Sequence, residues 1–158
     1  MIKCHLMSAA ALAAILIAGS ANAQTDRAAD KAAVEKTVKE LVTTYATTDD
    51  KKFASYFHEP WMQIGTGRVL NTTAEAEKSI AEGRKSLPKD YEHFNVKQLS
   101  AKMLGKDFAM VSYAGERQTK DNKTLQTAAG SFFLKRTDAG WKVAAGISYP
   151  AEDYIKLD

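Results

Sequence analysis

The sequence predicts an α+β fold in which three N-terminal helices lie against a curved antiparallel sheet. Apolar residues first recur at helical spacing, and after about residue 90 the pattern changes to strand-length runs. The last two runs, 130–136 and 141–149, are joined by the short turn Thr137-Asp-Ala-Gly140. Consecutive strands joined by turns this short are antiparallel. We therefore expect the helices to gather on one face of the sheet, with no parallel crossover.

The first 23 residues have the pattern of a signal peptide. Lys3 gives a positive start, and residues 7–18 form an apolar stretch that is too short for a permanent membrane span. Ala21-Asn-Ala23 offers the small residues that a signal peptidase reads. We expect cleavage before Gln24 in a bacterial chain that is exported to the periplasm or secreted, with no stable membrane anchor afterwards. The alternative is an uncleaved N-terminal anchor.

Residues 24–158 are long enough for one domain with its own core. The single cysteine, Cys4, precedes the cleavage site, so the mature chain must fold without disulfides. Without Lys3 the chain has 21 basic against 19 acidic residues. This balance gives no reason to expect binding to nucleic acid or to a membrane surface.

The two leading helices follow from apolar spacing and capping residues. Between residues 26 and 47, one helical stripe is formed by Ala33, Val34, Val38, Leu41, Val42 and Tyr45. Asp49-Asp50 can cap a short second helix, in which Phe53, Tyr56 and Phe57 return to the same side. We expect Pro60 to end this helix, because proline lacks a backbone donor and disfavours helical geometry in the preceding residue.

A short strand and a third helix precede the main sheet. Residues 61–64 read as the strand, and Gly65-Thr-Gly67 as the turn after it. Thr72 or Thr73 caps the third helix, which extends to about Leu87. Four strand-length runs follow, at residues 91–104, 107–120, 124–137 and 141–149.

The chain resembles the nuclear-transport-factor-2-like superfamily, which includes SnoaL-like polyketide cyclases and ketosteroid-isomerase-like domains. Three motifs carry the resemblance: a helix leading into the segment 49–57, the exit His58-Glu-Pro-Trp61 into a strand, and the closing hairpin 132–143. The resemblance covers about residues 30–149. The resemblance implies a cone-shaped domain, in which the sheet wraps a cavity that the helices close.

The isomerase chemistry of that superfamily does not transfer to this chain. In ketosteroid-isomerase-like relatives, a tyrosine on the first helix and an aspartate after the first strand carry the proton transfer. The resemblance places those positions near Leu41 and near Gly65 or Thr66, whose side chains cannot serve as the base. We expect no cofactor and no metal site, because the mature chain has no thiol and its two histidines, His58 and His93, are about 35 residues apart.

The resemblance places seven polar or aromatic residues around the cavity: Tyr45, His58, Trp61, Tyr113, Arg117, Ser131 and Tyr149. His58 is the best candidate for a catalytic residue, because histidine exchanges protons near neutral pH. The alternative for His58 is a partly exposed residue that caps the short helix. Tyr45 and Trp61 either contact a ligand or belong to the core.

Arg117 interrupts the apolar alternation of its strand. It is four residues from Tyr113 and shares a face with it. The guanidinium either reaches solvent near the strand end or points at an anion in the cavity, because a buried unpaired charge is costly.

Both faces of this strand carry apolar residues, with Phe108, Met110 and Ala114 on one and Ala109, Val111 and Tyr113 on the other. Only one of these faces can pack against the helices. We therefore expect a homodimer in which a second copy of the chain covers the other face.

Three functions are compatible with these observations. The first is an exported domain that binds a small hydrophobic or amphipathic molecule in its cone. The second is a SnoaL-like enzyme (cyclase, isomerase or dehydratase) with His58 as its acid or base. The third is a protein-interaction module that acts through its sheet face. The fold alone does not choose among them, since one architecture hosts unrelated functions.

Overall fold

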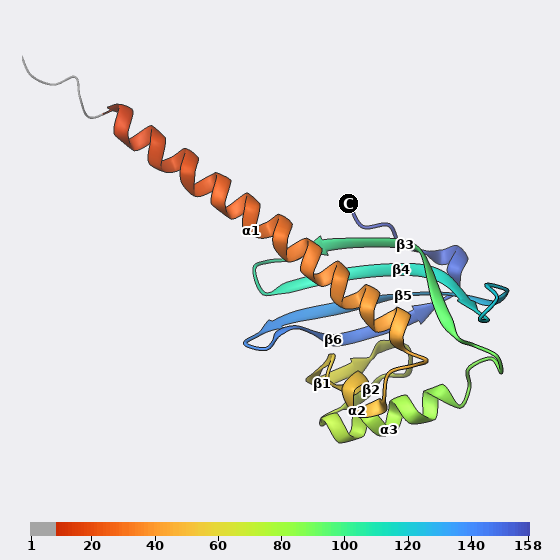
Figure 1. The fold of residues 1–158 in the computed structure, drawn as a ribbon. Coiled ribbons are helices and arrows are strands. Elements are labelled where there is room, and N and C mark those ends of the chain that lie inside the picture. Colours follow the sequence, from red (N-terminus) through yellow and green to blue (C-terminus); the bar gives the residue numbers. More distant parts are fainter. Residues whose placement is uncertain (1–8) are drawn as a thin grey trace, which may run out of the picture.

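The computed structural model describes the backbone of residues 9–158 and the side chains of residues 27–158. The first half of the chain contains α1 (Ala9–Thr44), α2 (Asp50–Ala54), β1 (Phe57–Gln63), a 3-10 turn (Ile64–Thr66), β2 (Arg68–Leu70) and α3 (Thr73–Arg84). The second half contains β3 (His93–Met103), β4 (Phe108–Gln118), β5 (Thr124–Thr137), β6 (Gly140–Tyr149) and a 3-10 turn (Ala151–Asp153). The predicted α+β class, with three helices ahead of a meander, is confirmed (Figure 1).

The six strands form one curved sheet in the order β2-β1-β6-β5-β4-β3. Strands β3 to β6 pair antiparallel, as predicted. The expectation of no parallel crossover is wrong, because the meander returns β6 to the side of β1 in the same direction, and the two strands pair in parallel. The short edge strand β2, which follows the 3-10 turn, was not predicted from the sequence.

Helix α1 crosses one face of the sheet and packs against β3, β4 and β6 (Figure 1). We call this face of the sheet the inner face. The predicted stripe of α1 is buried at four positions, Val34, Val38, Leu41 and Val42. Ala33 lies to the side of the stripe and is exposed. At the far end of the sheet, Arg136 forms an ion pair with Asp30, and this pair ties the helix to β5.

Pro60 lies inside β1, so the prediction that it ends the second helix is wrong. Helix α2 ends earlier, at Ala54. The pairing of β1 with β6 changes register between Phe57 and Met62. A residue without a backbone N–H is tolerated at such an irregularity, because no ladder hydrogen bond is lost there.

Helix α3 is anchored at its N-terminus by two carboxylates. Thr72 caps the helix, since its Oγ1 accepts a hydrogen bond from the backbone N–H of Glu75 at 3.2 Å. The Glu75 carboxylate in turn accepts from the backbone of Asn71 at 2.6 Å. The Glu59 carboxylate of β1 accepts from the hydroxyl and the backbone N–H of Thr73, and these bonds lower the pKa of Glu59. The helix is thereby joined to the first strand.

Aromatic rings on the inner face occupy the space that side chains would fill at three glycines of neighbouring strands. The pairs are Phe94 with Gly115, Tyr113 with Gly130, and Phe132 with Gly146. The Tyr113 and Phe132 rings are stacked with their centroids 5.5 Å apart, and Phe94 meets Tyr113 edge-on at 5.9 Å. The three rings form a continuous aromatic row across β3, β4 and β5.

The outer face of the sheet is partly covered by the chain's own C-terminal segment. The Ser100 hydroxyl is hydrogen-bonded to the hydroxyl of Tyr154 at 2.8 Å, and it accepts from the backbone N–H of Leu157 at 3.0 Å. Phe108 at the start of β4 remains 51% exposed. The segment therefore covers the sheet near β3 and leaves apolar surface elsewhere on this face.

The predicted signal peptide, residues 1–23, lies outside the residues whose side chains the structure describes. The backbone of residues 1–8 is not described either. Cleavage before Gln24 therefore stays a prediction. Within residues 9–158, no helix is long and apolar enough to cross a membrane.

Replacing Gly130 should destabilise the fold through its contact with Tyr113. A Cβ at this position would lie 2.9 Å from the Tyr113 ring and 2.7 Å from the backbone oxygen of Ile147. We expect Gly130→Ala to lower the free energy of unfolding by about 1–3 kcal/mol, as overpacking does in other cores. Gly65→Ala is the matched control, because a Cβ at Gly65 meets no atom within 4 Å. Urea unfolding measures both variants, and equal midpoints would contradict the packing argument.

Candidate functional site

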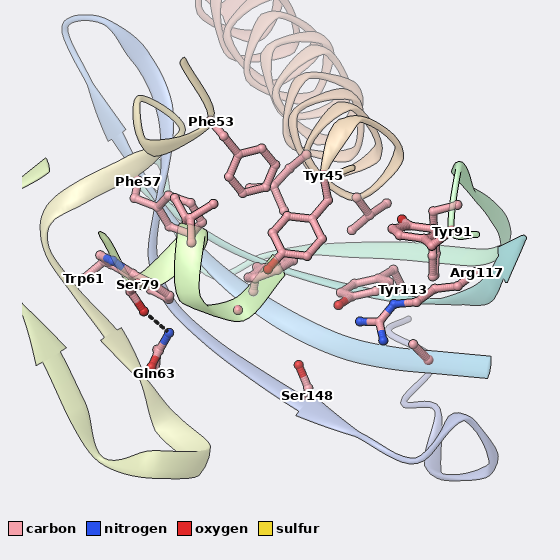
Figure 2. A pocket seen from close by; sticks show the side chains of 17 residues that line it. Tyr45, Phe53, Phe57, Trp61, Gln63, Ser79, Tyr91, Tyr113, Arg117 and Ser148 are labelled. Atoms are coloured by element: carbon pink, nitrogen blue, oxygen red, sulfur yellow. Dashed lines mark hydrogen bonds between the residues drawn. The ribbon is translucent and has the colours of Figure 1, made fainter. Parts of the chain in front are cut away.

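A cavity of about 240 Å³ lies between the inner face and the helices (Figure 2). At about 30 Å³ per water molecule, it has the volume of roughly eight waters. Its 17 lining residues come from all three helices, from the turn after α1, from β1, from the four meander strands and from the segment before β3. The predicted cone therefore contains an open space of a size that suits a small molecule.

One end of the cavity is formed by packed aromatic rings. Phe57 and Trp61 of β1 lie with centroids 4.4 Å apart, and Phe53 of α2 lies 5.8 Å from Phe57. Trp61 is only 7% exposed, and its indole N–H has no hydrogen-bond partner among the described residues. Beside these rings, the amide of Gln63 donates to the Ser79 hydroxyl at 3.2 Å. This end is buried and mostly apolar.

The other end is polar and reaches solvent. Arg117 of β4 is half-buried, and its guanidinium donates to the Gln126 side-chain oxygen at 2.5 Å. The guanidinium carbon lies 6.0 Å from the centroid of the Tyr91 ring, within the range of a cation–π contact. Ser148 of β6 is exposed, and in Figure 2 its hydroxyl, the phenol of Tyr113 and Arg117 lie around the same end of the cavity.

Three phenols line the cavity as neutral groups. Burial raises the pKa of Tyr45 and of Tyr91, and it raises the pKa of Tyr113 to about 12. The positive charge of Arg117 acts in the opposite direction on all three and does not outweigh burial. A phenol is protonated at neutral pH even at its ordinary pKa, and burial moves its ionisation further away, so all three can donate hydrogen bonds.

The lining contains no side chain that accepts a proton near neutral pH. Among the described residues that line the cavity there is no Asp, Glu, His, Lys or Cys, and Arg117 carries the single charge. Across residues 27–158, no three His, Cys, Asp or Glu side chains gather closely enough to hold a metal ion. The cavity thus offers donors, one cation and apolar surface, and no general base.

Four of the seven residues proposed from the sequence line this cavity, namely Tyr45, Trp61, Tyr113 and Arg117. Arg117 shares the inner face with Tyr113, as the four-residue spacing predicts. His58 does not line the cavity. It is half-buried on β1, and its Nδ1 lies 3.0 Å from the backbone oxygen of Pro60.

The structure places Ser131 and Tyr149 on the outer face, away from the cavity. Their hydroxyls are 2.7 Å apart, and Ser131 also bonds the Ser112 hydroxyl at 2.7 Å. Their neighbours Phe132 and Ser148 line the cavity instead. A shift of one residue along a strand exchanges its two faces, which is why the sequence assigned the wrong member of each pair.

Several lining residues were missed, although some of them leave a signal in the sequence. Gln63 is two residues after Trp61 on a strand and therefore shares its face. Ser79 is three residues after Ala76 on the buried side of α3. Of the positions that correspond to the isomerase residues, Leu41 lines the cavity, whereas Gly65 and Thr66 lie in the 3-10 turn and do not.

Solved structures share this fold at low sequence identity. An NTF2-like protein with a cystatin-like fold from Novosphingobium aromaticivorans has a TM-score of 0.60 at 14% identity, covering 94% of each chain. A hexachlorocyclohexane dehydrochlorinase from Novosphingobium barchaimii has a TM-score of 0.59 at 15% identity, covering 85% of this chain and 94% of that one. A ketosteroid isomerase-like protein from Erwinia carotovora atroseptica has a TM-score of 0.54 at 17% identity, covering 75% and 94%. These likenesses show the fold alone.

The family comparison agrees with the fold. No curated protein matches the sequence. The family described as NTF2-like protein (DUF6841) matches residues 30–151, which include the C-terminal part of α1, α2, α3 and every strand of the sheet. The chain therefore belongs to this NTF2-like family.

Proposed function

We propose that the protein is an exported domain that binds a small, partly apolar molecule in its cavity. The observation that carries the proposal is the lining: eight aromatic residues surround an open space of about 240 Å³, with a few polar groups at defined positions. Ligand sites in proteins typically combine a mostly apolar wall with a small number of placed polar groups.

The same lining favours binding over proton-transfer chemistry. His58, the proposed acid or base of the enzyme alternative, is outside the cavity lining, and burial raises the pKa of the phenols that do line it, further from neutral pH. The dehydrochlorinase and the isomerase-like protein share the fold, but a shared fold does not carry a reaction to this chain. An interaction module would not need an open cavity, so the lining gives that alternative less support.

A thermal-shift screen of small metabolites tests ligand binding. A compound present at a hundredfold excess over its Kd should stabilise the folded chain by about 2.7 kcal/mol. Ala128→Phe should abolish this stabilisation, because Ala128 lines the cavity from β5 and the added ring would occupy it. Thr127→Phe is the matched control, since Thr127 is exposed on the opposite face of the same strand and should leave binding intact.

Two results of this screen would count against the proposal. Equal stabilisation of Ala128→Phe and the wild type would place the binding site elsewhere. If no compound of any class raises the melting temperature, the support for ligand binding is lost.

Export is part of the proposal and is supported by the pattern of the first 23 residues. Expressed in a bacterium, the protein should accumulate outside the cytoplasm with Gln24 as its first residue, as read by mass spectrometry. Ala23→Phe should block processing, because the position before the cleavage site needs a small side chain. Thr25→Phe, beyond that site, should be processed normally. A wild-type chain found intact at 17.3 kDa in the membrane fraction would favour the uncleaved anchor.

We further propose that two copies associate through the outer face. Phe108 is exposed there, and Met110 and Phe133 are half-buried cross-strand neighbours. Light scattering at micromolar concentration should give twice the chain mass. Phe133→Glu should produce a monomer, because a carboxylate would lose its hydration at the interface. The exposed residue Lys51 on α2 offers the control Lys51→Glu, and a monomeric wild type would refute the dimer.

A further inference from the structure

Arg117 differs from the other half-buried arginines in the described part of the chain. Arg84 and Arg136 each form an ion pair with an aspartate, whereas Arg117 has no carboxylate within 4.0 Å and donates only to the neutral amide of Gln126. A partly desolvated guanidinium is costly without an anionic partner. The protein thus holds a cation at the cavity without neutralising it.

The surroundings of Arg117 supply further hydrogen-bond donors. A guanidinium has five N–H donors in a planar fork, and the bond to Gln126 uses one nitrogen. The phenol of Tyr113 and the hydroxyl of Ser148 lie at the same end of the cavity (Figure 2). The Tyr113 phenol is protonated at neutral pH and can donate to an anion. The Arg117 guanidinium therefore keeps N–H groups that its bond to Gln126 does not use, next to two hydroxyl groups.

The position of Arg117 also sets the orientation of a ligand. Ser148 is exposed, so a charged group bound at this end keeps part of its hydration. Phe57 and Trp61 form the buried, apolar end. A molecule with a charged head and an apolar body would place its head at Arg117 and its body against these rings.

We infer that the ligand is a small monocarboxylate with an aromatic or aliphatic body, and that Arg117 binds its carboxylate. The inference rests on the proposed function and specifies the ligand class of the same cavity. A carboxylate matches the planar fork of arginine with two parallel hydrogen bonds. The cavity volume of about 240 Å³ limits the body to roughly one ring or a short chain.

Matched acid and amide pairs test the inference by calorimetry at pH 7. The probes are benzoate with benzamide, phenylacetate with phenylacetamide, cinnamate with cinnamamide, and hexanoate with hexanamide. Members of a pair have nearly the same shape and differ in charge, so the comparison isolates the head group. We expect at least one acid to bind the wild-type protein about 10- to 100-fold more tightly than its amide, the range that a hydrogen bond to a charged group provides.

Variants then assign the preference to Arg117. Arg117→Gln should reduce acid binding to the level of the amide while leaving the amide affinity unchanged. Arg117→Lys should keep part of the preference, because it retains the charge without the planar fork. Arg68→Gln is the control, since it removes the same charge from an exposed position on β2 outside the lining. Circular dichroism melts establish that each variant is folded, and Arg117→Lys carries the test if Arg117→Gln does not fold.

The outcomes distinguish the inference from the proposed function. If acid and amide bind the wild type equally, the carboxylate inference is wrong and ligand binding stands. If the acid preference survives in Arg117→Gln, the anion site lies elsewhere and the assignment to Arg117 is overturned. If no member of any pair binds, while the metabolite screen finds a neutral ligand, the ligand class is wrong. Failure of both experiments overturns the proposed function together with the inference.

Discussion

The cavity depends on the packing of aromatic rings over glycines on the inner face of the sheet. A ring that occupies the side-chain space of a glycine lies close to the backbone, so it leaves room between the sheet and the helices. Tyr113 reaches across β5 at Gly130, and Phe132 reaches across β6 at Gly146. With any larger residue at these glycines, the rings would have to rise toward α1 and fill the space that the helices enclose. The backbone positions without a Cβ therefore determine whether the cone is open or filled.

Helices and strands with a clear hydrophobic periodicity were predictable from the sequence. The pairing of strands that are distant in the sequence was not. The stripe of α1 and the meander follow from three-to-four and two-residue periodicities, which report local backbone geometry. The parallel contact between β1 and β6 joins segments about 80 residues apart in sequence, and no local pattern encodes it. Pro60 was misassigned for a related reason, because the irregularity that accommodates it exists only once β6 lies beside β1.

For single residues of the candidate site, too, local spacing was predictable from the sequence and the pairing between strands was not. Tyr113 and Arg117 were placed correctly relative to each other, since four residues along a strand preserve the face. Ser131 was placed on the wrong face because both faces of β5 carry small or apolar residues, so hydropathy does not show which face is turned inward. The two faces of β5 are distinguished by the residues that lie opposite on the neighbouring strand. Gly130 lies opposite Tyr113, and this pairing exists only in the folded sheet.

Burial affects Tyr113 and Arg117 differently, and the difference determines which ligand the cavity can bind. It raises the pKa of the Tyr113 phenol to about 12, further above neutral pH than the ordinary value, so this group stays a hydrogen-bond donor. It cannot neutralise Arg117, because an arginine side chain remains charged in proteins. A lining with a permanent cation, neutral donors and no carboxylate therefore stabilises negative charge that a ligand already carries. General base catalysis requires a group that changes protonation near neutral pH, and the lining residues supply none. The lining residues therefore favour the proposed binding of an anionic ligand over proton-transfer chemistry.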